Sequence, residues 1–197
     1  AWSTWTNAAG STLKIYDALL TTGTLTATAT GNNVEYYGNA AQNIKATAYY
    51  NLQVSGSGGV TRLPANIITD GNINITDTLD ANGFNISMKG NWANTNKFIA
   101  GTGTVTFNGT AGIQTITNIL GETFNNLTVA SGSTVNIPAG TTATVSSTYS
   151  NAGTTDNDGI LALAGGYSGQ TGTLMGIGTH RLTGGNWNNN TGTFTRE

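Results

Sequence analysis

The sequence predicts an all-β protein, a parallel β-solenoid built from short strands. Short segments alternate apolar and polar residues with a period of two, which is the pattern of a half-buried strand. Gly, Asn or Ser bounds each segment, so turn signals recur about every eight to ten residues. A helical period of about 3.6 residues is missing almost everywhere. The local signal is therefore strand and turn throughout.

Four segments carry the alternation most clearly. They are Asn72–Ile75 (NINI), Thr104–Phe107 (TVTF), Asn126–Val129 (NLTV) and Thr134–Ile137 (TVNI). The intervening stretch SMKGNWANTNKFIA is too rich in Asn and Gly to hold a helix. We expect strands at these four places.

Internal repeats organise the chain. Three Trp-x-Asn phrases begin at Trp5, Trp92 and Trp187. They predict one continuous domain, 1–197, made of two repeats of about 90 residues (5–91 and 92–186) and a partial third, 187–197.

A second correspondence lies between these phrases. Val34–Ala65 matches Val105–Ala139 in order, with Tyr36 answering Phe107 and the only two prolines at corresponding places. Low-complexity composition would align Gly and Thr by chance but would not align aromatics, glutamines and prolines. The match predicts a true repeat.

Two all-β architectures fit such repeats. Asn82-Gly83 and Asn108-Gly109 favour the alternative, tandem immunoglobulin-like sandwiches, because Asn-Gly supports two-residue hairpin turns. The solenoid is favoured by very short strands, repeats that run together without a linker, and too few large aromatics for two compact sandwich cores. We expect the solenoid.

The repeat phrases resemble the β-helical repeat regions of large bacterial and archaeal cell-surface proteins, adhesin-like or stalk-like. The phrases that carry the resemblance are GNWANTNKFIAGTGTVTFNGTAGIQTI, FNNLTVASG and GNINITDTLDANGFNISMKGNW. They cover most of 34–145 and return at 185–194. The resemblance implies a β-helical scaffold at the cell surface.

Composition excludes several classes of partner. Only 8% of residues are charged and the formal net charge is -2, with Lys and Arg scattered singly, so a nucleic-acid partner is not expected. No apolar run reaches the roughly eighteen residues of a membrane span. Cysteine is absent, which rules out disulfides and thiolate chemistry. Because the sequence starts at Ala1 without a leader, we expect a processed, exported chain.

No catalytic constellation stands out, and we expect the protein not to be an enzyme. The single histidine, His180, is interpreted as a solvent-facing residue at a strand end. Asp70, Asp77 and Asp80 form the densest acidic group, but each occupies a place where Asp commonly caps a turn. A polysaccharide lyase or glycosidase acting through Asp77 or Asp80 is the weakest hypothesis.

No cofactor is expected, although one segment could bind calcium. Asp156, Asn157 and Asp158 offer oxygen ligands before a flexible glycine, but the segment lacks the remaining EF-hand ligands and fits a plain turn. Five Asn-x-Ser/Thr sequons are possible glycosylation sites, at a frequency that chance explains: Asn74, Asn85, Asn108, Asn126 and Asn189.

The tyrosines offer a possible glycan surface. Tyr36, Tyr37, Tyr49 and Tyr50 could stack on sugars. Alternate residues of a strand must face inward, however, and Tyr36 corresponds to Phe107 in the repeat. We expect most of them to be core residues.

These observations favour an extracellular or cell-surface structural protein that polymerises head to tail. An uncapped solenoid exposes backbone groups and apolar surface that another copy can cover. The terminal segments would carry assembly through Trp2, Trp5, Asn7, Leu13, Trp187, Thr193 and Phe194. The alternative is an adhesin or carbohydrate-binding module from a longer surface protein, with surface glycans as partners.

Overall fold

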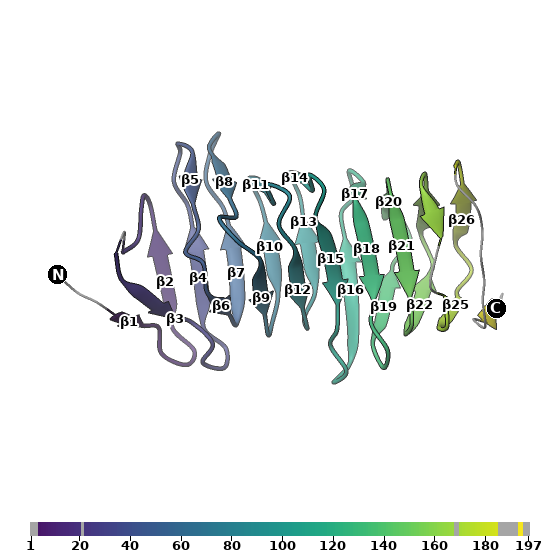
Figure 1. Cartoon of the computed structure of the whole chain (residues 1–197), viewed down its shortest axis with the longest axis horizontal. Coiled ribbons are helices and arrows are strands. Elements are labelled where there is room, and N and C mark those ends of the chain that lie inside the picture. The colour runs from purple at the N-terminus through teal and green to yellow at the C-terminus, as the bar shows by residue number, and fades with distance from the viewer. Residues whose placement is uncertain (1–3, 21, 168–169, 185–192, 195–197) are drawn as a thin grey trace.

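A computed structural model describes residues 4–20, 22–167, 170–184 and 193–194, and in these residues the secondary structure is strand and turn, without helix. The strands stack in parallel into a β-solenoid of about nine turns, which Figure 1 shows with its long axis horizontal. The predicted fold is confirmed. Tandem sandwiches are excluded, because neighbouring strands pair in parallel and come from successive coils. No helix in the described part of the chain is long and apolar enough to span a membrane.

Each coil has three sides, which we call faces 1, 2 and 3 in the order in which the chain visits them. Face 1 is one sheet of ten strands. Its strands are β2 (Thr12–Ile15), β4 (Asn33–Tyr36), β7 (Asn51–Val54), β10 (Ile73–Ile75), β13 (Trp92–Asn94), β16 (Ile113–Thr117), β19 (Thr134–Ile137), β22 (Thr154–Asn157), β25 (Thr173–Met175) and β27 (Thr193–Phe194).

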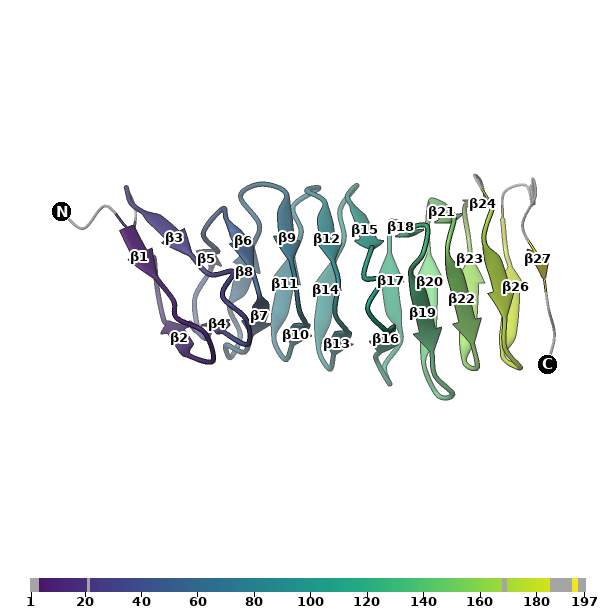
Figure 2. The same ribbon diagram turned by 90° about the horizontal axis from the view of Figure 1, so that it is seen from below.

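Face 2 consists of two four-stranded sheets placed end to end, as Figure 2 shows. The first contains β5 (Gln42–Asn43), β8 (Val60–Arg62), β11 (Thr78–Asp80) and β14 (Lys97–Ile99). The second contains β17 (Glu122–Phe124), β20 (Thr142–Val145), β23 (Ile160–Leu163) and β26 (Thr179–Leu182). β14 and β17 are neighbours but do not pair, so the hydrogen-bonded ladder of face 2 is interrupted there.

Face 3 is a seven-stranded sheet that continues into a two-stranded sheet at the amino-terminal end. The larger sheet contains β6 (Ala48–Tyr49), β9 (Ile67–Thr69), β12 (Ile86–Met88), β15 (Thr104–Phe107), β18 (Asn126–Val129), β21 (Thr148–Asn151) and β24 (Gly166–Tyr167). The smaller contains β1 (Thr4–Thr6) and β3 (Thr24–Thr26), and a bridge between Ala27 and Tyr49 joins the two.

The coil length explains the strong alternation in the sequence. Residues that pair across neighbouring coils lie between 18 (Val34 and Leu52) and 24 (Trp92 and Ile116) positions apart. Alternate residues of each strand point into the solenoid, and like positions stack into columns. Leu52, Ile73 and Trp92 form one such column on face 1. Because these side chains are no more than 1% exposed, the core is a continuous apolar axis.

Asparagine ladders link the coils at their corners and account for the abundance of Asn. The Asn51 side-chain oxygen accepts the Asn72 N–H at 2.8 Å, and the Asn72 oxygen accepts the Asn91 N–H at 2.8 Å. The Asn91 oxygen in turn accepts the Thr115 N–H at 2.9 Å. Each side chain thus satisfies a backbone donor at a corner, where the strand ladder has stopped.

Two corners show why glycine is needed. A Cβ at Gly56 would lie 2.0 Å from the Gly38 carbonyl oxygen, so neighbouring corners approach too closely for any side chain. Asn82 and Gly83 have φ values of 53° and 80°, as a type I′ turn requires. That turn joins β11 to β12 on adjacent faces. Asn82-Gly83 therefore forms the expected turn but not a hairpin, whereas Asn108-Gly109 has no positive φ and forms no such turn.

The repeated phrases do not occupy the same faces. Val34 lies in β4 on face 1, whereas its counterpart Val105 lies in β15 on face 3. Trp5 lies in β1 on face 3, and Trp92 lies in β13 on face 1. The structural unit is the coil, and the longer sequence repeat advances by a non-integral number of coils.

Candidate functional site

The amino-terminal end of the solenoid presents a half-exposed indole. β1 is paired with β3, with Trp5 opposite Leu25. The Trp5 side chain is 49% exposed. Together with Thr4, Thr6 and Leu20 it lines a hollow of about 420 Å³. Trp5 is therefore exposed at this end of the solenoid, and its role in assembly stays a prediction.

The other two amino-terminal candidates have different surroundings. Asn7 is buried, and its Nδ2 donates to the Asn33 carbonyl oxygen at 3.1 Å. Its own carbonyl oxygen accepts from the Asn32 side chain at 3.0 Å, so Asn7 joins the first coils internally. Leu13 is partly buried against the core on β2, the edge strand of face 1. Leu13 fits an end surface, whereas Asn7 is already occupied within the chain.

The carboxy-terminal end leaves part of the core column open. Leu182 on β26 pairs with Leu163 on β23. Leu163 is 2% exposed, while Leu182 is 50% exposed because β26 is the last strand of face 2 in the described residues. On face 1, Thr193 and Phe194 pair with Thr173 and Leu174. Trp2 and Trp187 lie outside the described residues.

The predicted calcium ligands do not converge. Asp156 and Asn157 lie in β22, where the burial alternates, so Asn157 faces the core and Asp156 faces outward. The Asn157 amide donates to the Thr179 carbonyl oxygen at 3.0 Å, which links it to the next coil. Asp158 follows in the turn and accepts the Ile177 N–H at 3.4 Å. In the described residues, no group of three or more His, Cys, Asp or Glu could hold a metal ion.

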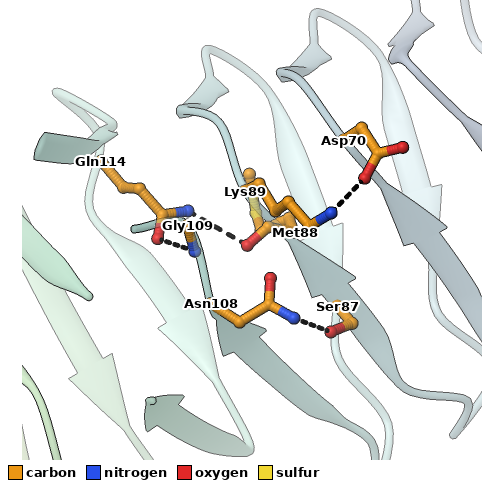
Figure 3. Close-up of polar contacts among 7 residues, drawn as sticks. All are labelled: Asp70, Ser87, Met88, Lys89, Asn108, Gly109 and Gln114. Carbon is orange, nitrogen blue, oxygen red and sulfur yellow. Dashed lines mark hydrogen bonds and ion pairs between the residues drawn. The ribbon is translucent and has the colours of Figure 1, made fainter. Parts of the chain in front are cut away.

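The asparagines of the sequons differ in whether their side-chain amides donate hydrogen bonds. Asn126 donates to the Thr102 carbonyl oxygen at 3.1 Å, and Asn108 donates to Ser87 Oγ at 3.0 Å (Figure 3). N-glycosylation replaces one of the two Nδ2 hydrogens, so a single N–H would remain for these contacts. Asn74 lies on the outward side of β10, and Asn85 is exposed. Asn189 lies outside the described residues.

Two members of the acidic group, Asp70 and Asp80, make contacts between coils. Asp70 pairs with Lys89 at 2.7 Å, as Figure 3 shows. Asp80 lies on a different face, where it pairs with Arg62 at 3.2 Å and caps the turn by accepting the Asn82 N–H. The Asp80 cap is the turn role that the sequence predicted, whereas the ion pairs between coils were not predicted.

Gln114 makes a comparable link at the corner beside Asp70 and Lys89. Its oxygen accepts the Gly109 N–H at 2.8 Å, and its nitrogen donates to the Met88 carbonyl oxygen at 3.1 Å (Figure 3). Gln114 is 1% exposed. Its buried amide satisfies backbone groups that the strand ladder leaves unpaired in this longer coil.

A buried carboxylate, which the sequence did not reveal, lies at the interruption in face 2. Glu122 is 2% exposed. Its Oε2 accepts from Trp92 Nε1 at 2.7 Å, from Asn94 Nδ2 at 2.8 Å and from Asn118 Nδ2 at 3.4 Å. No ion pair in the described part of the chain includes it.

Burial raises the pKa of the Glu122 carboxyl, although the hydrogen bonds from Trp92, Asn94, the Thr123 N–H and Asn118 act in the opposite direction. The indole of Trp92 also packs edge-on against Phe98 and Phe124, with ring centroids 4.8 and 5.5 Å away. Glu122 therefore fastens face 1 to face 2 where the backbone ladder stops. Its two shortest hydrogen bonds come from Trp92 and Asn94 in an earlier coil, which no local sequence signal could have identified.

The tyrosines divide between core and surface. Tyr36 and Tyr49 are fully buried, with their hydroxyl oxygens 3.2 Å apart. Tyr16 and Tyr37 are 53% and 40% exposed, and their rings lie edge to face with centroids 5.3 Å apart. The inward role predicted for Tyr36 and Tyr49 is confirmed, while Tyr37 forms an outer pair with a tyrosine that sequence reasoning passed over.

Comparison with known proteins finds no matching family model, no similar curated protein and no similar solved structure.

Proposed function

We propose that this chain is a structural protein of the cell exterior that assembles head to tail into a filament. The observation that carries the proposal is the state of the two end coils. An indole stands half exposed at the amino-terminal end, and the core column reaches the surface at Leu182. Stacking one end on the other would cover both apolar surfaces.

The sheet edges support the same arrangement. β2 is the first strand of the ten-stranded face 1 and β27 is the last. An edge strand presents unpaired N–H and C=O groups that can pair with another chain. Because the two edges belong to opposite ends of one parallel sheet, a contact between them joins unlike surfaces and repeats without closing. Such a contact gives a fibre.

The chemistry of the surface is compatible with dense stacking. With only 8% of residues charged and a net charge of -2, copies repel each other weakly. The location outside the cell rests on the resemblance of the repeat phrases to bacterial and archaeal surface proteins. The scarcity of clustered titratable groups supports a structural role.

A proline in the edge strand tests the proposal. The carbonyl oxygens of Ser11 and Ile15 accept hydrogen bonds from the N–H groups of Asn33 and Tyr37 in the next coil. Backbone groups of successive residues in a strand point to opposite sides, so the Thr12 N–H points away from β4, toward the unpaired edge of the sheet. Thr12→Pro would remove an outward donor and leave the β2–β4 ladder intact. Thr12→Val keeps that donor and serves as the control.

We expect Thr12→Pro to stay folded but monomeric, while the wild type and Thr12→Val form filaments in negative-stain electron microscopy. Removal of the last ten residues, which include β27, should give the same soluble subunits. Normal filaments from both altered chains would refute head-to-tail assembly through these edges.

A further inference from the structure

A groove lies on face 2 beside β5, where the first coil has no strand. Residues 17–20 connect β2 to β3 as an irregular segment, so β5 is the edge of its sheet. The space between this segment and β5 measures about 480 Å³. Volumes of about 300–1,000 Å³ are typical of small-ligand sites.

Two side chains of the second coil hold the groove open in a fixed shape. Gln42 is 8% exposed, and its amide can accept the Gly38 N–H at 3.0 Å while donating to the Asp17 carbonyl oxygen at 3.3 Å. At the other end of the segment, Lys45 Nζ donates to the Leu20 carbonyl oxygen. The irregular segment is therefore tethered at both ends, and the groove exists before any ligand arrives.

The outer tyrosine pair is next to this groove along the chain. Tyr16 directly precedes Asp17, which lines the groove, and its hydroxyl donates to Asn39 Oδ1 at 2.8 Å. Lys14 Nζ lies 6.0 Å from the Tyr37 ring centroid and pairs with Glu35 at 2.8 Å. Both rings are held by neighbours, so stacking on them costs little further side-chain entropy.

The chemistry of the lining narrows the ligand. Asp17, Gln42 and Asn43 provide carboxylate and amide groups, and Leu19 and Leu20 provide apolar surface. Lys45 is the only cation among the lining residues, and its ammonium is engaged by a backbone carbonyl. A phosphorylated or polyanionic ligand would lack charge partners there. A sugar ring, with an apolar C–H face and a rim of hydroxyls, matches aromatic faces flanked by amides.

We propose that the Tyr16–Tyr37 pair and the adjoining groove form a binding site for a neutral oligosaccharide. The sugar rings stack on the two tyrosines, and the next residues of the glycan enter the groove toward Asn43 and Asp17. This site uses the side of the first two coils, and it shares Leu20 with the hollow beside Trp5 at the amino-terminal end.

Isothermal titration of the monomeric Thr12→Pro chain with neutral hexasaccharides (β-1,4-glucan, β-1,4-xylan, α-1,4-glucan and chitin series) tests the proposal. Oligogalacturonate and an extended β-strand peptide serve as competing ligand classes. We expect at least one neutral series to bind. Tyr16→Ala and Tyr37→Ala should each weaken binding about tenfold, equivalent to 1.4 kcal/mol.

Tyr16→Phe keeps the ring and should bind within about threefold of the parent, a difference of about 0.65 kcal/mol. Ile68→Ala, an equally exposed apolar side chain on face 3 (52%), should leave binding unchanged. Circular dichroism melts confirm that each variant is folded. Absence of binding by every neutral series at millimolar concentration, binding only of the peptide or the acidic glycan, or equal affinity of the alanine variants would overturn the assignment.

Discussion

Glu122 provides the sharpest test of how face 1 is fastened to face 2 at the interruption of the face 2 ladder. Replacing it with Ala removes the acceptor of three side-chain donors, on Trp92, Asn94 and Asn118. A buried donor left without a partner costs about 1–3 kcal/mol. Part of this cost is offset, because the buried carboxylate and its desolvation penalty are also removed. We expect Glu122→Ala to lower the free energy of unfolding by about 3 kcal/mol, a large share of the 5–15 kcal/mol typical of domains.

The same residue gives a pH dependence of definite sign. Burial raises the pKa of Glu122 in the folded state above the ordinary value of 4.5. The stability that this group contributes is therefore fully present below 4.5 and is lost as the pH rises through the raised value. Acidification from neutral pH toward 4.5 should stabilise the wild type relative to Glu122→Gln, which cannot titrate at this position.

Urea unfolding followed by tryptophan fluorescence at several pH values measures both effects. Asp156→Asn is the matched control, because Asp156 is an outward-facing carboxylate on β22. A loss below about 1 kcal/mol in Glu122→Ala, or a pH slope in Glu122→Gln equal to that of the wild type, would show that the buried network does not work as described.

Two further substitutions probe the corners of the coils. Asn72→Ala removes the acceptor of the Asn91 N–H and should cost about 1 kcal/mol in urea unfolding; an unchanged midpoint would mean that water replaces the ladder. Gly56→Ala should destabilise by more than about 2 kcal/mol, because its Cβ would meet the Gly38 carbonyl oxygen at 2.0 Å and the backbone must move. Gly166→Ala is the control, because there is open space around the new methyl group. It should be neutral or slightly stabilising in urea unfolding. Equal losses of stability at both glycines would contradict the packing described.

The sequence predicted the strands well because each strand's signal is local. The alternation at Thr104–Phe107 and Thr134–Ile137 appears as β15 and β19 with the same bounds. The face of the coil on which each repeat phrase lies could not be predicted from the sequence. Val34 and Val105 head similar phrases but lie on faces 1 and 3, because every face of a three-sided coil offers the same half-buried environment. A phrase specifies a strand, a corner and the next strand, and it can begin on any face.

The site residues show the same contrast between local sequence signals and contacts between coils. Trp5 was identified from its phrase and is exposed, but its counterpart Trp92 is fully buried. Whether a Trp-x-Asn phrase faces solvent depends on whether another coil stacks on it, which the phrase does not encode. The Glu122 network and the Tyr16–Tyr37 pair both join residues from different coils. They could be found only once the coil lengths were known.

Cysteine cross-linking between copies tests head-to-tail stacking most directly. The chain has no native cysteine, and stacking that aligns the first residues of β27 and β2 would place Thr193 of one copy beside Thr12 of the next. Neighbouring parallel strands lie about 4.8 Å apart, within reach of a disulfide. The double variant Thr12→Cys/Thr193→Cys should give a ladder of oxidised oligomers on a non-reducing gel, whereas Thr12→Cys/Asn74→Cys, with its second thiol in mid-rod, should not. A monomer band alone from the first variant, or identical ladders from both, would contradict assembly through the ends.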